Sequence, residues 1–258
     1  ASVAPTPVSA LLHAVAVVKG GVFALMRVVY WCFGAGFLIG TKVQAAVLCV
    51  CCITILYGSL RALCTQHLKR RLAYSTVSQL SYILMGVMLM TPAGLAAGLT
   101  HMVCHALMKI TLFFCAGAIL YKGGREYVYE LRGVGRAMPV TMTCFTLAGL
   151  GLVGVPLFAG FVSKFMLGSA AAEAGGLGML GVACLIISAF FTLFYMVLII
   201  GAAWFPAEGR EDSHWNTHCD PNWNMKLPLI AITAMSMVLG LWSGPLIQVF
   251  NRIAAGGM

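Results

Sequence analysis

The sequence contains few charged residues. Only 9% of its 258 residues are Asp, Glu, Lys or Arg, 61% are hydrophobic, and the mean hydropathy is +0.95. Soluble proteins average about 25% charged residues, so this deficit excludes a water-soluble enzyme. The long polar stretches of a soluble domain, a disulfide scaffold or a disordered tail are also missing. The composition therefore indicates an integral membrane protein.

The apolar stretches are long enough to cross about 30 Å of hydrocarbon, which takes about 20 helical residues each. Membrane-spanning strands would instead show alternation over about ten residues, which the sequence lacks. We therefore predict one all-α transmembrane domain over 1–258 with about seven helices. They are expected at 7–29, 43–64, 72–90, 95–121, 139–172, 178–204 and 227–249.

The charges that are present are mostly basic and collect on one side of these predicted spans. The sequence has sixteen Lys and Arg but only seven Asp and Glu. Loops 65–71, 122–138 and 205–226 hold most of the bases, whereas the opposite side holds Arg27, Lys42 and Arg252. The positive-inside rule then places these loops in the cytoplasm and the C-terminus outside. This fits an inner organellar membrane as well as a bacterial plasma membrane, of which we favour the bacterial one. This pattern accounts for the basic excess without a nucleic-acid partner.

The predicted membrane interior contains lysines and no acids. Lys19, Lys109 and Lys164 lie well inside apolar spans, whereas all seven acids lie in loops or at span ends. A charged group at mid-bilayer costs from about 3 to more than 10 kcal/mol unless it is paired or hydrated. Snorkelling to the interface is the alternative, but it suits residues near helix ends. The three lysines therefore indicate an ion path.

Two histidines join Lys109 on one helix face. His101, His105 and Lys109 recur every four residues, which gives one polar stripe about 12 Å long. Histidine suits a proton relay because both of its protonation states are accessible near neutral pH. Zinc is the usual alternative for two histidines four residues apart, but no Glu follows His101 and only thiols could add a ligand. We therefore predict a relay and no metal.

Three further patterns have simple interpretations. The sequence Gly149–Gly154 matches a dinucleotide-binding pattern but lies in an apolar span, so we expect helix packing and no nucleotide cofactor. The C-x-x-C sequence at Cys49–Cys52 also lies within a span, which favours reduced thiols. His214, His218 and Cys219 share an aqueous loop, where a metal site is a lesser alternative.

The predicted span 139–172 is too long for one straight crossing. Pro156 and nearby glycines lie in its middle, so we expect a discontinuous helix. Lys164 follows Pro156 by two turns, where carbonyl groups freed by the break could solvate an ammonium. Broken helices at mid-membrane often mark ion sites. We therefore add Lys164 to the predicted path.

Four motifs together resemble a known family. They are Pro5–Ala14, Leu68–Leu80, the stripe of His101, His105 and Lys109, and Gly160–Lys164. In this order they resemble the antiporter-like proton-conducting subunits of respiratory complex I, membrane-bound hydrogenases and multisubunit sodium/proton antiporters. The resemblance covers nearly all of residues 3 to 250.

The resemblance implies a fold of fourteen core helices with two inverted five-helix repeats. The chain resembles helices eight to fourteen: 1–30 would be the last helix of the first repeat, 43–204 the second repeat, and 227–249 the final helix. We therefore expect a fragment that lacks the N-terminal helices. The family's first half supplies a buried Glu and its partner Lys, and no such pair exists here.

The family also implies roles for individual residues. By position, Lys164 resembles the outward exit of a half-channel, and Lys109 with His101 and His105 resembles its central relay. Lys19 with His13 resembles the link between the two halves. From the residues alone, His13 and Lys19 are six positions apart, so they do not share one helical stripe.

The leading hypothesis is a proton-translocating membrane subunit of a redox-driven complex, of the NADH-quinone oxidoreductase or hydrogenase type. Redox catalysis would belong to partner membrane subunits, so no cofactor is expected in this chain. One alternative is a subunit of a cation/proton antiporter that exchanges Na⁺ along the same path. A second alternative is a structural scaffold whose buried lysines carry nothing.

Overall fold

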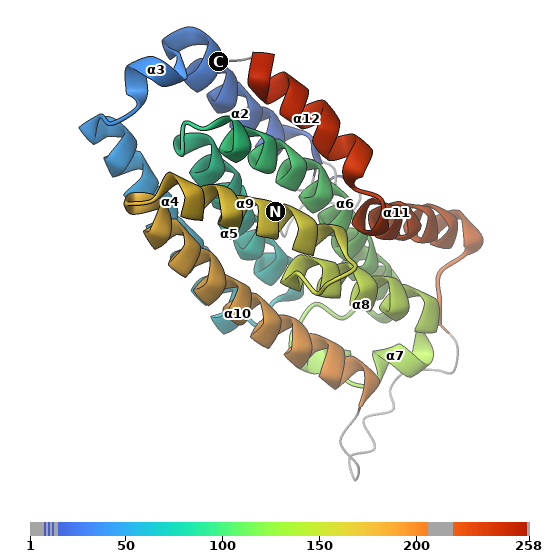
Figure 1. Cartoon of the computed structure of the whole chain (residues 1–258). Helices are drawn as coiled ribbons and strands as arrows, with labels where there is room; N and C mark the ends of the chain where they lie inside the picture. The colour runs from blue at the N-terminus through green and yellow to red at the C-terminus, as the bar shows by residue number, and fades with distance from the viewer. Residues whose placement is uncertain (1–7, 9, 11, 13–14, 206–218, 257–258) are drawn as a thin grey trace.

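The computed structural model describes residues 8, 10, 12, 15–205 and 219–256 and is almost entirely helical (Figure 1). Within these residues there is no strand, and the single β-bridge joins His67 and Tyr127. The predicted all-α class is confirmed. The principal helices are α2 (Val17–Arg27), α4 (Lys42–Cys64), α5 (Leu68–Met88), α6 (Pro92–Gly123), α8 (Pro139–Val153), α9 (Ala159–Ala174), α10 (Leu177–Trp204), α11 (Trp223–Leu241) and α12 (Gly244–Gly256).

Four of the described helices are long and apolar enough to cross a membrane, namely α4, α6, α10 and α11. Helix α5 has 21 residues but carries Lys, Arg, Ser and Gln side chains, so it is less apolar than these four. Helix α8 is apolar but has only 15 residues. The all-helical membrane architecture is therefore present, and the count of seven spans stays a prediction.

The C-terminal part differs from the prediction. A single helix was expected over 227–249, but α11 ends at Leu241 and α12 begins at Gly244, and the two run in different directions in Figure 1. Pro245 explains the division, because proline lacks the backbone N–H of a helix interior and disfavours helical geometry in the residue before it. Helix α12 packs instead along α6.

Of the first predicted span, 7–29, the structure describes residues 8, 10 and 12 and the continuous stretch from 15 onward. Helix α2 continues directly into a π-helix, Val28–Phe33, which is followed by the short helix α3 (Ala35–Leu38). The Tyr30 hydroxyl donates a 3.1 Å hydrogen bond to the carbonyl of Val87 and fixes this segment against α5. The predicted path residue His13 lies outside the described residues.

The predicted span 139–172 consists of two helices. Helix α8 ends at Val153, α9 begins at Ala159, and Pro156 lies in the intervening segment. Gly154, which follows α8, has φ +95°, a value that L side chains rarely adopt. At the other end of α8, Asp220 accepts hydrogen bonds from the backbone of Val140 and Thr141, so a carboxylate caps the positive end of the helix dipole.

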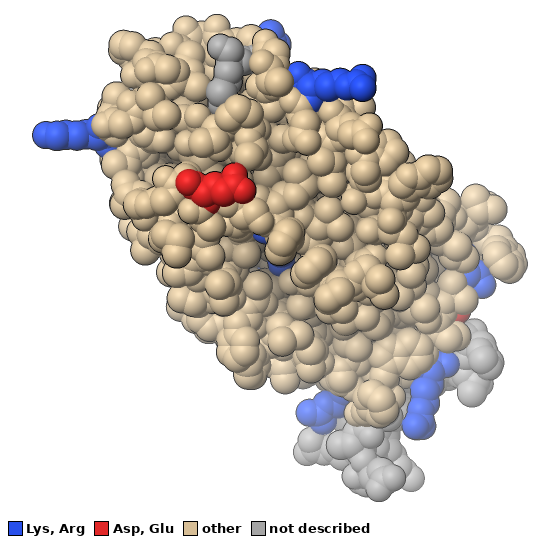
Figure 2. Space-filling view, in the orientation of Figure 1, with Lys and Arg blue, Asp and Glu red and all other residues tan. Residues whose placement is uncertain are grey.

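Helix α6 lies at the centre of the molecule and contacts α5, α8, α9, α11 and α12. Large apolar side chains of α4 and α10, by contrast, are exposed, as expected for helices that face lipid. Figure 2 shows Lys and Arg gathered at the two ends of the molecule, while the broad middle of this face is almost free of charge. Because α6 lies at the centre, its polar stripe of His101, His105 and Lys109 lies in the interior of the molecule.

Candidate functional site

The predicted path residues that the structure describes come together around α6. His101, His105 and Lys109 are all 0% exposed, and Lys164 on α9 and Lys19 on α2 are also buried. Both lysines lie near enough to interact electrostatically with all three groups of the α6 stripe. Five titratable side chains from three helices therefore form one buried cluster, which we call the Lys/His cluster.

His101 is held between two neighbouring helices. Its Nδ1 atom lies 2.9 Å from the Ser163 hydroxyl on α9, and its Nε2 atom lies 3.1 Å from Gln79 Oε1 on α5. The edge of the Tyr82 ring packs against the imidazole, with 5.7 Å between ring centroids. Hydrogen bonds to both ring nitrogens fix the orientation and tautomer of a histidine, which a directional proton transfer requires.

His105 is differently placed. Its ring stacks almost parallel to that of His101, with centroids 5.9 Å apart and an interplanar angle of 8°. Neither of its ring nitrogens has a hydrogen-bond partner among the described side chains and backbone groups. A buried imidazole with two open nitrogens can both accept and donate a proton without first breaking a hydrogen bond.

Lys109 points toward α5. Its ammonium donates hydrogen bonds to the Leu72 carbonyl, at 2.9 Å, and to the Ser75 hydroxyl. These acceptors are neutral oxygens, so they solvate the ammonium without neutralising its charge.

Lys164 lies at the break between α8 and α9. Its Nζ atom donates to the carbonyls of Leu152, at 2.7 Å, and Val153, at 3.0 Å, which are the last two residues of α8. Terminal helix carbonyls have no partner within their own helix, and a cation near them also interacts favourably with the helix dipole. The same ammonium lies 5.7 Å from the centroid of the Tyr82 ring.

Several residues of the site were not predicted. Ser75, Gln79 and Ser163 lie inside the motifs that carry the family resemblance but received no role, and Tyr82 was not singled out. Their signal was present, since Ser75, Gln79 and Tyr82 recur every three to four residues within the predicted span 72–90. A scan for polar residues at helical spacing would have found this face of α5.

Two other features of the molecule lie apart from the Lys/His cluster. His67 Nε2 lies 3.2 Å from Glu126 Oε2, just before the start of α5. The described part of the chain holds no group of three His, Cys, Asp or Glu residues that could bind a metal. Of the loop residues considered for a metal, Cys219 donates its backbone N–H to the Ala137 carbonyl at 2.8 Å, whereas His214 and His218 lie outside the described residues.

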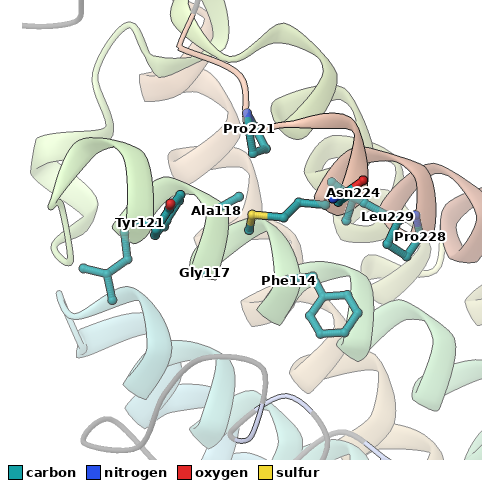
Figure 3. A pocket seen from close by; sticks show the side chains of 10 residues that line it. Phe114, Gly117, Ala118, Tyr121, Pro221, Asn224, Pro228 and Leu229 are labelled. Atoms are coloured by element: carbon teal, nitrogen blue, oxygen red, sulfur yellow. The ribbon is translucent and has the colours of Figure 1, made fainter.

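A pocket of about 630 Å³ lies between the end of α6 and the start of α11 (Figure 3). Phe114, Ala118, Met225 and Leu229 give it an apolar wall, and Tyr121 and Asn224 are its polar side chains. It contains no Lys or His, so we do not include it in the candidate path.

Comparison with known proteins gives relatives over nearly the whole chain. The family model "NADH:quinone oxidoreductase/Mrp antiporter, TM" matches residues 1–199. The NADH-quinone oxidoreductase subunit L of Mycobacterium tuberculosis is 34% identical over 92% of this chain and 36% of its own length. A probable K(+)/H(+) antiporter subunit of Rhizobium meliloti is 34% identical over 93% of this chain and 24% of its own length. The chain thus spans about a third or less of these two relatives.

Solved structures have the same fold. The membrane-bound sulfane sulfur reductase, an archaeal respiratory membrane complex, contains a chain that superposes with a TM-score of 0.86 at 26% identity. The match covers 98% of this chain and 49% of that one. The Mrp complex from Dietzia sp. matches with a TM-score of 0.85 at 24% identity, over 98% of this chain and 53% of that one, which concerns the fold alone. With the family model matching more than half of its length, the chain belongs to the NADH:quinone oxidoreductase/Mrp antiporter transmembrane family.

Proposed function

We propose that this chain moves protons across the membrane as a subunit of a larger, redox-driven membrane complex. The observation that carries the proposal is the Lys/His cluster, in which three lysines and two histidines are buried together in the helical interior. Such a concentration of titratable bases away from water is costly for a purely structural element. Proton transfer explains why each of these titratable side chains lies in the interior.

The chemistry needs only proton transfer. Lys109 and Lys164 alternate between ammonium and amine, and His101 and His105 between imidazolium and imidazole. Lys19 contributes positive charge within range of the histidines and Lys109, so its charge state biases theirs. A conformational or electrostatic change in a partner subunit would then load and release protons in sequence.

The alternative is a cation/proton antiporter subunit that uses the same path. The similarity to a probable K(+)/H(+) antiporter subunit supports this alternative. A site for Na⁺ requires several oxygen ligands. The oxygens around Lys109 and Lys164 are carbonyls and a hydroxyl that already accept hydrogen bonds from the ammonium groups, which favours protons.

The finer architecture is part of the same proposal. We place 43–204 as the second inverted repeat, 1–30 as the last helix of the first repeat and 227–249 at the final helix position, within a longer protein of about seven spans in this part. The protein would lie in a bacterial plasma membrane. Its cytoplasmic side would be the one with many Lys and Arg, at the ends of α4 and α6 and the start of α5, and the C-terminus would lie outside. The partners would be further membrane subunits.

The decisive experiment compares Lys109→Met with Lys122→Met in the full parent protein and its complex. Both lysines lie on α6, but Lys109 is 0% exposed and Lys122 lies on the surface. Inverted membrane vesicles would be supplied first with a reductant and then with a Na⁺ gradient, and proton uptake followed with a pH-sensitive dye. Removing a proton-transfer group typically costs 10²-fold or more, so we expect Lys109→Met to slow uptake at least about fivefold even with residual routes.

The pattern of loss distinguishes the candidate functions. A loss of reductant-driven uptake by Lys109→Met, with Lys122→Met unchanged, supports the redox-driven subunit. A loss confined to Na⁺-driven exchange supports the antiporter function. Full uptake with both drivers in Lys109→Met would contradict both and favour the scaffold, because methionine then merely replaces a buried charge by an apolar side chain.

We also expect Gln79→Met to slow proton uptake severalfold without loss of the assembled protein. Methionine fills a similar volume but leaves His101 Nε2 without its 3.1 Å partner. An unsatisfied buried nitrogen costs about 1–3 kcal/mol, which the imidazole avoids by turning away from its relay orientation. Gln66→Met, at an exposed position, is the control. Unchanged uptake in Gln79→Met would show that this hydrogen bond does not orient His101 for transfer.

A further inference from the structure

The helix beside the histidines carries its own stripe of hydroxyl groups. Ser75, Ser78 and Tyr82 on α5 are separated by three and four residues, so they lie on one face. All three side chains are buried, with Ser75 and Ser78 1% exposed and Tyr82 0% exposed. Ser75 is bonded to Lys109 at one end of the Lys/His cluster, and the Tyr82 ring lies against His101 and Lys164 at the other end.

The first end of this stripe is Lys109. The Lys109 ammonium donates to the Ser75 hydroxyl, whereas His105, one turn earlier on α6, has no hydrogen bond to Lys109 or to any other described group. The lysine is thus connected to α5, and the step from Lys109 to His105 along α6 has no hydrogen bond. A proton that leaves Lys109 finds its first bonded acceptor on the neighbouring helix.

The middle of the stripe joins three helices. Ser78 on α5 lies 2.8 Å from the Ser59 hydroxyl on α4 and 3.1 Å from the Ser188 hydroxyl on α10. Ser59 and Ser188 are also hydrogen-bonded to each other. Ser59, Ser78 and Ser188 therefore form a closed ring of hydroxyls, which we call the serine cluster. Each of these hydroxyls can both donate and accept.

The second end of the stripe is Tyr82. Its hydroxyl donates a 2.7 Å hydrogen bond to Ser188 of the serine cluster. Its ring lies 5.7 Å from the Lys164 ammonium and packs edge-on against His101. Tyr82 thus touches the serine cluster through its oxygen and both far members of the Lys/His cluster through its ring.

We infer that Ser75, the serine cluster and Tyr82 form a second proton route from Lys109 to Lys164, parallel to the histidines. This inference rests on the proposed function. The Lys109 ammonium gives a proton to the Ser75 oxygen, which passes its own proton on. One water bridges Ser75 and Ser78, since residues three apart on a helix have Cβ atoms about 5–6 Å apart. Successive O–H bonds break and form through the serine cluster to the Tyr82 hydroxyl. A second water carries the proton from this hydroxyl to the Lys164 amine, because the Lys164 nitrogen lies over the Tyr82 ring, 5.7 Å from its centroid, and makes no direct hydrogen bond to the Tyr82 oxygen.

The steps balance without any other reactant. Every hydroxyl and each bridging water gains one proton as it loses one, so the net change is one N–H bond lost at Lys109 and one gained at Lys164. After a passage the hydroxyl groups have reversed their donor and acceptor directions, and they rotate back before the next proton. The neutral serines and the tyrosine carry no lasting charge, which suits a site surrounded by apolar helices.

Parallel and serial routes differ in how variants combine. Tyr82→Phe removes one oxygen and keeps the ring against His101 and Lys164. If the two routes conduct equally, Tyr82→Phe and His105→Ala should each slow proton uptake about twofold, and the double variant at least about tenfold. Ser188→Ala should behave as Tyr82→Phe does in both backgrounds. Uptake is measured in inverted vesicles of the full complex, per assembled protein.

Ser81→Ala is the matched control. Ser81 precedes Tyr82 on α5 and is also buried, but its hydroxyl bonds to Thr54 and to the Val77 carbonyl outside the serine cluster. It should leave uptake unchanged in both backgrounds. The route is overturned if adding Tyr82→Phe or Ser188→Ala to His105→Ala causes no further loss, because equal loss in single and double variants indicates one serial path. Unchanged uptake in Lys109→Met instead refutes the proposed function itself.

Discussion

Replacing Gly160 with alanine is expected to disrupt the junction of α8 and α9 and to slow proton uptake more than tenfold. A Cβ atom at Gly160 would lie 1.8 Å from the Gly151 carbonyl oxygen and 3.2 Å from Met108 Sδ. The oxygen belongs to the backbone of α8, so it cannot move aside as a flexible side chain would. Overpacking of a core typically costs about 1–3 kcal/mol, and a backbone contact of this kind belongs at the upper end.

The loss of transport would follow from the position of Lys164, one turn after Gly160 on α9. If α9 moves away from α8, the Lys164 ammonium leaves the carbonyls of Leu152 and Val153, to which it donates at 2.7 and 3.0 Å. The melting temperature of the purified complex and the uptake per assembled protein would report the two effects separately. We expect both to fall.

Gly168→Ala is the control for Gly160→Ala because it makes the same substitution on the same helix. A Cβ atom at Gly168 meets nothing within 4 Å. Since alanine is favoured over glycine by about 1 kcal/mol within a helix, Gly168→Ala should be neutral or slightly stabilising. Equal melting temperatures for the two variants would contradict the close approach of α8 and α9.

The sequence predicted the helices well where hydrophobicity alone determines them. Helices α4 and α10 begin within a residue of the predicted limits and end at them, and α6 extends two to three residues further at each end. Length and apolar composition suffice there, because a spanning segment must satisfy all of its backbone groups internally. The prediction of one helix over 227–249 was wrong because residues 242–244 give no break in the hydropathy. The backbone geometry before Pro245 nevertheless does not permit one continuous helix.

The sequence predicted the site residues that share one helix, but not the contacts that these residues make with other helices. His101, His105 and Lys109 share α6, so helical periodicity alone places them on one face. Which residues they meet depends on how α5, α9 and α10 are rotated against α6, and the sequence of a single helix does not determine that rotation. For this reason Ser188, far along the chain, received no role, although its hydroxyl bonds to Ser78 and Tyr82.

The Lys164 side chain combines two chemical properties at the contact between α8 and α9. As a hydrogen-bond donor it caps the last two carbonyls of α8, and as a titratable group it belongs to the Lys/His cluster. A loss of transport after its removal would therefore be ambiguous, because an uncapped helix end also destabilises the break. A substitution that keeps the donor and the charge but holds its proton separates the two roles.

Lys164→Arg is that substitution, and we expect it to leave the complex assembled while proton uptake falls more than about tenfold. The guanidinium keeps a positive charge and several N–H donors for the carbonyls of Leu152 and Val153, but it does not release its proton at any physiological pH. Because a positioned proton donor contributes typically 10²-fold or more, fixing this proton stops the relay at its last group.

Two further variants serve as references for Lys164→Arg. Lys164→Met removes the donor as well as the proton, so it should lower both the melting temperature and the uptake, whereas Lys122→Arg on the surface of α6 should change neither. Uptake is again measured in inverted vesicles of the full complex. If Lys164→Arg transports protons at the original rate, Lys164 keeps its proton throughout the cycle. Its contribution would then be confined to holding α8 and α9 together, and both the histidine and the hydroxyl routes would have to end at another group.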